Sequence, residues 1–183
     1  MAERLARDHA SLDRLLDELR AALDAGDITR SHERLDLFWA RLAVHIRAEH
    51  LQLFPAVLNA LTENKESDVS KTSFLSQAQH TIDELRRDHD FFMHELSRAI
   101  IVMRELLTTS ADSPVEKHFE DVRARVAVVA ERLATHNRLE EAGIYLWTRK
   151  LLSEAQQAAL GERVNEELAN MPPRFAADVK AQP

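Results

Sequence analysis

The chain of 183 residues contains no cysteine, three glycines, five prolines and a single tyrosine. The absence of cysteine excludes disulfides, thiolate metal sites and cysteine nucleophiles. So little glycine and proline argues against a loop-rich β fold. There is no apolar run near the roughly 18 residues that a membrane-spanning helix needs, and the N-terminus carries no apolar signal segment. We therefore expect a cytoplasmic, helical protein with no membrane partner.

Positive charge is also scarce. Lysine and arginine total 24 against 31 aspartates and glutamates, which gives a net charge of −7 with histidine neutral. No basic face dominates, so we expect no nucleic-acid partner. The hydrophobic share of 45% is ordinary for a soluble globular protein, and the length suits one domain with a sizeable core. Against this background the nine histidines are the unusual feature of the composition.

Apolar residues recur every three or four positions along most of the chain, which is typical of amphipathic helices. This pattern predicts five helices, over about residues 2–25, 29–55, 73–109, 114–149 and 153–170. Residues 62–72 are polar and aperiodic, and we expect a loop there.

Helix-boundary signals support these ranges. Gly26 is suited to end the first helix. Pro55 should kink or end the second, with room for another turn or two as far as Leu61. Ser113-Pro114-Val115-Glu116 is a capping box that opens the fourth helix, and Ser153-Glu154-Ala155-Gln156 repeats its logic for the fifth.

One motif occurs twice, as His45-Ile46-Arg47-Ala48-Glu49 and as His136-Asn137-Arg138-Leu139-Glu140. Residues four apart stack on one face of a helix, with their Cβ atoms roughly 5–6 Å apart. In both copies the histidine and the glutamate continue the apolar stripe, at positions where a helix bundle should have leucines. Buried there without partners they would be costly, so they need a compensating group.

The motif belongs to a longer internal repeat. Leu5, Arg7, Asp8, His9, Leu12 and Leu16 match Leu85, Arg87, Asp88, His89, Phe92 and Leu96 at an offset of 80. The two His-x3-Glu pairs match at an offset of 91. Each half is thus a helix with one core histidine, followed by a helix with a core His-x3-Glu. Two such hairpins facing each other would bring six donors to one level and build a dinuclear metal site, and these candidate ligands are His9, His45, Glu49, His89, His136 and Glu140.

The other five histidines lie off the apolar stripes, at positions 32, 50, 80, 94 and 118. Imidazole and carboxylate donors together suit iron, manganese, zinc or copper, and fit magnesium or calcium poorly. The ferritin-like di-iron pattern needs Glu-x-x-His, and no histidine here has a glutamate three residues before it.

The ordered set of H … HxxxE … H … HxxxE over about residues 5–150 resembles the hemerythrin-like (HHE cation-binding) family, and Leu-Phe-Pro at 53–55 is also similar to it. The resemblance implies two iron ions joined by an oxo or hydroxo bridge, with zinc or manganese as the lesser alternatives. His9 and His45 would serve one iron, His89 and His136 the other, and Glu49 and Glu140 would bridge them.

The chain departs from the oxygen carriers of that family at one point. These have a further histidine on the third helix, four residues from the first, where this chain has Leu85 or Met93. Either one iron is more open or another group fills the gap, and the candidates are His50, His94, Glu141 and Tyr145.

We predict an all-α fold, an antiparallel up-down-up-down four-helix bundle with a short additional C-terminal helix. Residues 1–150 would form the metal-binding bundle, 151–171 a C-terminal helix packed on it, and 172–183 a mobile tail. The predicted function is a di-iron protein that binds or reacts with O2, NO or peroxide, as carrier, sensor or peroxide-consuming enzyme. The alternative is an iron-responsive interaction protein whose metal is mainly structural and whose helix at 153–170 reports occupancy. A zinc bundle is a third option, and the sequence predicts no oligomeric state.

Overall fold

The structure, a computed structural model, describes residues 2–63, 69–108 and 115–175. Within these ranges every regular element is helical, and no β-strand occurs. The predicted all-α class is confirmed. The helices are α1 (Ala2–Asp24), α2 (Ile28–Ala48), α3 (Phe54–Glu63), α4 (Val69–Thr108), α5 (Val115–Leu139), α6 (Tyr145–Leu151) and α7 (Glu154–Ala169), followed by a 3-10 turn at Pro173–Phe175.

Two π-helical turns interrupt the second and fourth predicted helices. The turn η1 (Glu49–Leu53) joins α2 to α3, and η2 (Glu140–Ile144) joins α5 to α6. We expected Pro55 to kink or end the helix, with room for another turn or two as far as Leu61, and the helix continues to Glu63. Pro55 lies in the first turn of α3, where its missing N–H is tolerated, and the preceding π turn has already changed the hydrogen-bond ladder.

The chain reverses where the boundary signals indicate. Gly26 has a φ of +68°, the left-handed conformation that glycine adopts without strain. Asp27 caps α2 by accepting a hydrogen bond from the Arg30 backbone N–H at 3.0 Å. Ser153 and Gln156 form the predicted capping box of α7.

Other boundary predictions fall partly beyond the described residues. The predicted box at Ser113 lies outside them. So do residues 64–68 of the predicted loop, while helices cover its remaining positions. Residues 176–183 of the predicted tail also lie outside, and Phe175 just before them is buried.

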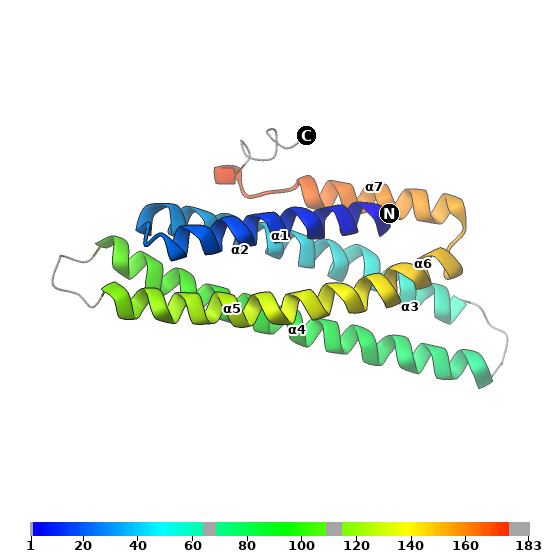
Figure 1. Cartoon of the computed structure of the whole chain (residues 1–183). Coiled ribbons are helices and arrows are strands. Elements are labelled where there is room, and N and C mark those ends of the chain that lie inside the picture. The colour runs from blue at the N-terminus through cyan, green and yellow to red at the C-terminus, as the bar shows by residue number, and fades with distance from the viewer. Residues whose placement is uncertain (1, 64–68, 109–114, 176–183) are drawn as a thin grey trace.

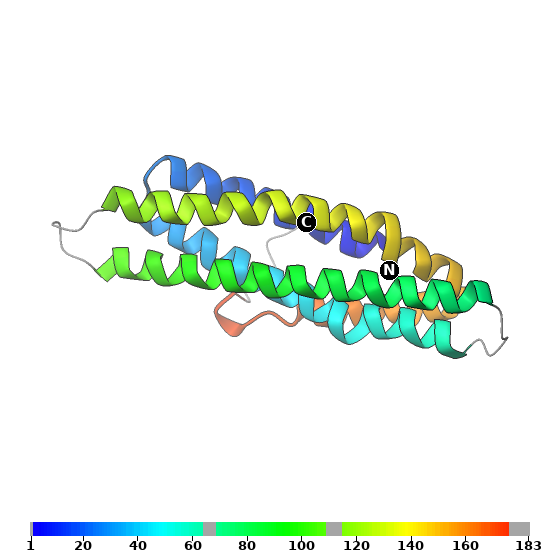
Figure 2. The ribbon, with the colours of Figure 1, turned by 90° about the horizontal axis from the view of Figure 1, so that it is seen from below.

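The four long helices lie side by side along the molecule (Figures 1 and 2). α1 packs on α2, α2 on α4, α4 on α5, and α5 on α1, so that they enclose a common core. α7 runs back along the outside of α1 and α2 (Figure 1). Arg47 in α2 ties it down, donating from Nε to the Glu167 carboxylate at 2.8 Å.

A polar layer divides the core into two apolar clusters. Along α1, Leu5 belongs to one cluster and Leu12 to the other, with His9 between them. Along α4, His89 separates Leu85 from Phe92 in the same way. The fold thus places apolar packing on both sides of a level where histidines and glutamates face one another. Among the described residues, no helix is long and apolar enough to span a membrane.

Candidate metal centre

The structure brings all six predicted donors together in the polar layer. Both glutamates are fully buried, and the four histidines are at most 3% exposed. Their donor atoms form two groups, each with members within 4.8 Å of one another. One group holds His9 and His45, the other holds His89 and His136, and both glutamates belong to both groups. Each group fits a metal-binding site, and the two groups share both carboxylates.

The π turns shape the centre, since each begins at the glutamate of a His-x3-Glu pair. In a regular α-helix the fifth residue after that glutamate would point about 140° away from it. The wider π turn brings this residue back toward the same face. The residue is Phe54 after Glu49 and Tyr145 after Glu140, and the Tyr145 hydroxyl lies 3.5 Å from a Glu140 oxygen.

Each histidine turns Nε2 to the interior and has a hydrogen-bond partner for Nδ1. His45 meets Asp8 at 2.8 Å, and His136 meets Asp88 at 3.2 Å. Arginines hold both aspartates in place, Arg41 at Asp8 and Arg132 at Asp88. Such outer partners fix the tautomer and orientation of metal-ligating imidazoles.

The other two histidines have partners from the opposite half of the repeat. His9 Nδ1 lies 3.0 Å from the Glu141 carboxylate, and His89 Nδ1 lies 2.9 Å from His50 Nε2. Burial lowers the pKa of His50, and the nearby His89 and Arg86 lower it further. Neutral His50 can accept the Nδ1 proton of His89. All four core imidazoles, when neutral, are therefore arranged to present Nε2 as an electron-pair donor.

The Nε2 atoms lie in two close pairs, and a cation between the members of a pair would stabilise the arrangement. His9 and His45 place these nitrogens 3.1 Å apart, and His89 and His136 place theirs 2.9 Å apart. Both Nδ1 atoms of the first pair face carboxylates, which only accept hydrogen bonds, so two neutral imidazoles would present Nε2 lone pairs to each other. A positive ion between them removes that repulsion.

The glutamates carry the same signal. Glu49 Oε2 and Glu140 Oε1 are buried and accept no hydrogen bond from any residue that the structure describes. Imidazole nitrogens lie nearby, at 3.3 Å for Glu49 Oε2 and 3.0 Å for Glu140 Oε1. Burial alone would raise the pKa of Glu49, but His45 and His89 lower it well below its usual range. Two buried, ionised carboxylates with unused oxygens beside paired imidazoles fit a metal-binding site.

The four candidates for an additional ligand fall into three classes. Tyr145 is buried and its hydroxyl reaches the centre, 3.2 Å from His9 Nε2 and 3.3 Å from Glu49 Oε1. Glu141 and His50 contact the outer nitrogens of histidines instead. His94 is exposed on α4. Only Tyr145 of these four faces the same interior as the six donors.

The remaining histidines do not join the centre. His80 is exposed, and His32 and His118 are partly exposed.

The apolar periodicity of the sequence did not point to the arginine partners of Asp8 and Asp88. The repeat carried the signal, because Arg41 and Arg132 are 91 residues apart, as are the two His-x3-Glu pairs.

Comparison with known proteins agrees with this geometry. The family model described as the Hemerythrin HHE cation binding domain matches residues 1–147, which include every residue of the centre. No curated protein and no solved structure matches the chain. The chain belongs to the hemerythrin HHE cation-binding domain family.

Proposed function

We propose that this protein is a non-haem di-iron protein that binds or reacts with O2, NO or peroxide. The observation that carries the proposal is the membership of Glu49 and Glu140 in both donor groups. Carboxylates shared in this way would serve both ions. His9 and His45 would hold one iron, and His89 and His136 the other.

The donor set supports iron with room for a small ligand. Two imidazoles and a carboxylate with open positions are typical of non-haem iron that reacts with oxygen. An iron pair, when bound, supplies redox chemistry toward O2, NO or peroxide. Zinc and manganese suit the same donors, and zinc differs from an iron pair in having no visible or near-ultraviolet absorbance.

The chain's own residues would prepare this site in three ways. Asp8, Asp88, Glu141 and His50 hold the four imidazoles by Nδ1. The apolar clusters on both sides exclude bulk water from the polar layer. Burial raises the pKa of Tyr145, and the charges of Glu140 and Glu49 raise it further, so its hydroxyl keeps a proton beside the donors.

We further infer that α1, α2 with α3, α4, and α5 with α6 form an antiparallel up-down-up-down four-helix bundle over residues 1–150. The sequential packing of the long helices supports this arrangement. α7 is then an additional helix on the outside of the bundle.

Metal analysis and optical spectroscopy of protein purified without added metal test the proposal. We expect two irons per chain, a near-ultraviolet band of an oxygen-bridged ferric pair, and a change of spectrum with azide or peroxide. Glu140→Gln should lose iron, whereas the matched change Glu131→Gln, at an exposed position on α5, should keep it. Saturation at one ion per chain, or retention of iron by both variants, would refute the dinuclear site.

The contacts of α7 favour one alternative, an iron-responsive interaction protein whose metal is mainly structural. Arg47 lies between His45 and Glu49 in the first motif. It donates from Nη2 to the backbone carbonyl groups of Glu167 at 3.0 Å and Asn170 at 2.9 Å. A shift of the Glu49 turn on metal binding would therefore reach the end of α7.

Hydrogen exchange of residues 154–169 separates the two functions. If α7 reports occupancy, metal removal should speed exchange in α7, and Arg47→Gln should abolish the difference. Arg138→Gln is the matched control, since Arg138 holds the same repeat position but its hydrogen bonds to described residues stay within α5. A spectrum that ignores azide and peroxide, together with metal-dependent exchange in α7, would favour the interaction protein. Metal-independent exchange together with ligand bands would favour the di-iron redox protein.

A further inference from the structure

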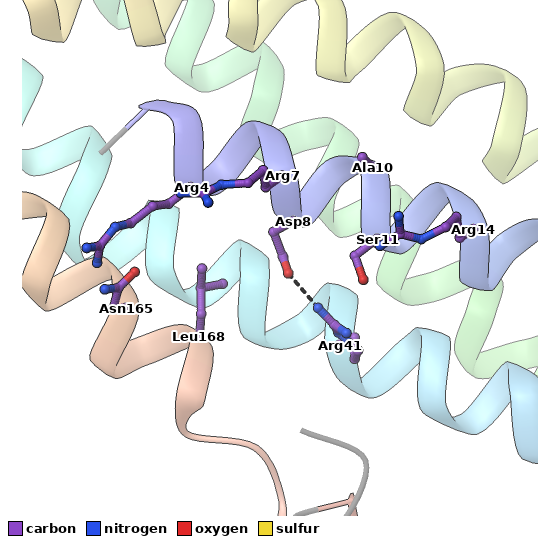
Figure 3. A pocket seen from close by; sticks show the side chains of 9 residues that line it. All are labelled: Arg4, Arg7, Asp8, Ala10, Ser11, Arg14, Arg41, Asn165 and Leu168. Carbon is purple, nitrogen blue, oxygen red and sulfur yellow. Dashed lines mark hydrogen bonds and ion pairs between the residues drawn. The ribbon is translucent and has the colours of Figure 1, made fainter. Parts of the chain in front are cut away.

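A groove with an unusual charge lies between α1, α2 and α7, outside the metal centre. Its volume is about 840 Å³. Arg4, Arg7 and Arg14 follow one another along its α1 wall, and Arg41 faces them from α2 (Figure 3). α7 contributes Asn165 and Leu168. We call this feature the arginine groove, after Arg4, Arg7, Arg14 and Arg41.

The arginine groove is basic although the chain carries a net charge of −7. Asp8 is the single carboxylate among its lining residues. Asp8 is already engaged, with Arg41 Nη2 at 2.5 Å on one oxygen and His45 Nδ1 at 2.8 Å on the other. The groove therefore has more positive charge than its own carboxylate can balance.

Three of the four guanidinium groups lack an acidic partner in the described part of the chain. Arg4 donates to the backbone carbonyl of Gly161 at 3.3 Å, and Arg7 to that of Glu3 at 3.1 Å. Neither these two nor Arg14 forms an ion pair with a carboxylate of a described residue. Their charges are free to meet an anion from outside.

The internal repeat shows that the scaffold does not require an arginine at position 4 or 14. At the offset of 80, Glu84 takes the place of Arg4, and His94 takes the place of Arg14. Phe91 stands where the first half has Ser11, and Arg132 stacks on its ring at 4.4 Å. In the second half, Arg132 thus holds Asp88 beside the ring of Phe91, and the surface there is less basic. The arginine groove is a property of the first half alone.

We propose that the arginine groove binds a small anion that carries more than one phosphate group. Guanidinium groups match phosphate oxygens with paired hydrogen bonds, which makes arginine the preferred residue for this chemistry. Arg4 and Arg14 are ten residues apart, or about 15 Å along a helix, so a single phosphate does not reach both. The volume lies within the range of small-molecule sites. The lining has no aromatic side chain, so recognition rests on the phosphates and not on a stacked base.

Calorimetric titration of the purified full chain with inorganic tripolyphosphate tests the proposal. We expect saturable binding of one anion per chain, and orthophosphate about tenfold weaker or more, because it reaches fewer guanidinium groups. The double variant Arg7→Gln/Arg14→Gln should weaken tripolyphosphate binding by about tenfold or more while its metal content stays unchanged. Both positions are exposed, so these substitutions leave the core intact.

Arg87→Gln is the matched control, since Arg87 is the exposed repeat equivalent of Arg7 and lies away from the groove. It should bind tripolyphosphate like the unsubstituted chain. Tripolyphosphate can also chelate metal, but this does not affect the comparison, because the variants and the unsubstituted chain have the same metal centre. Absence of binding, equal loss in Arg87→Gln, or undiminished binding in the double variant would overturn the proposal. Equal affinity for orthophosphate would overturn the requirement for more than one phosphate group.

Discussion

Tyr145 occupies in the second half of the repeat the place that Phe54 occupies in the first. Both residues follow a motif glutamate by five positions. The Tyr145 ring stacks on His9 with centroids 5.8 Å apart, and the Phe54 ring stacks on His89 at 6.1 Å. Only Tyr145 adds a hydroxyl, which lies 3.2 Å from His9 Nε2. The two donor groups are therefore chemically unequal, although the same π turn follows the motif glutamate in both halves.

Tyr145→Phe should strengthen azide binding to the iron-loaded protein by about five- to tenfold. The change removes one hydroxyl from the His9 side of the centre, where it would compete with a small ligand, and a single hydrogen-bonding group is worth about 1 kcal/mol. Iron content should not change, because the ring keeps its stacking on His9. An optical titration with azide measures the effect. Weaker azide binding in the variant would show that the hydroxyl assists the ligand and does not compete with it.

His45→Ala and Glu140→Ala should each lose far more metal than His32→Ala or His118→Ala. The first two side chains are buried in the donor groups, and the last two lie outside them. Loss of a direct donor should exceed the roughly 10–100-fold loss of affinity that follows removal of an outer partner. Metal content after dialysis against a weak chelator gives the comparison. Equal loading in all four variants would contradict the assignment of the centre.

Asp8→Asn and Asp88→Asn should each weaken metal binding by roughly 10–100-fold. These aspartates accept from the Nδ1 atoms of His45 and His136 and so leave Nε2 free. An asparagine amide can turn its N–H₂ toward Nδ1 and favour the wrong tautomer. Competition with a chromophoric chelator measures the affinity. Asp90→Asn, at an exposed position on α4, is the control and should bind like the unsubstituted chain.

Much of this centre follows from sequence periodicity. His9 and His89 continue the three-four spacing of apolar residues in their helices, and a repeat in two halves leaves few ways to bury such groups. The helix faces were therefore predictable, and so was the convergence of the six candidate donors. The structure brings all six together.

The π turns were not predictable in this way. The apolar pattern of a helix with 3.6 residues per turn does not reveal the extra residue of a π turn. Pro55 indicated only a kink or an end of the helix. Without the π turn, Tyr145 would be turned away from Glu140. The arginine groove could not be predicted from the sequence either. Asn165 and Leu168 line it because α7 packs back along α1 and α2.

The stability of the metal-free protein should depend on pH. Burial alone would lower the pKa of His45, but Glu49 and Asp8 raise it well above 6.5. Burial alone would also lower the pKa of His136, but Glu140 raises it above 6.5. A raised pKa means that the folded state binds protons more tightly than the unfolded state. The resulting stability is complete below pH 6.5, and it is lost as pH rises through the folded-state pKa values.

The glutamates act in the opposite sense. The pKa values of Glu49 and Glu140 are lowered from 4.5, so their stabilisation is present above pH 4.5 and is lost as pH falls through the lowered values. The metal-free protein should therefore melt at its highest temperature between about pH 4.5 and 6.5 and at lower temperatures on both sides.

Bound metal should oppose the loss of stability above pH 6.5. Metal ions bind only deprotonated imidazoles, so they bind more tightly as pH rises. The gap in melting temperature between metal-loaded and metal-free protein should consequently widen from pH 6 to pH 8, about the range in which histidine loses its proton. Calorimetric melting of both forms across this range measures the gap. His118→Ala should reproduce the widening, and His45→Ala should remove most of it. A gap that stays constant or narrows toward pH 8 would show that the core histidines do not exchange protons for metal.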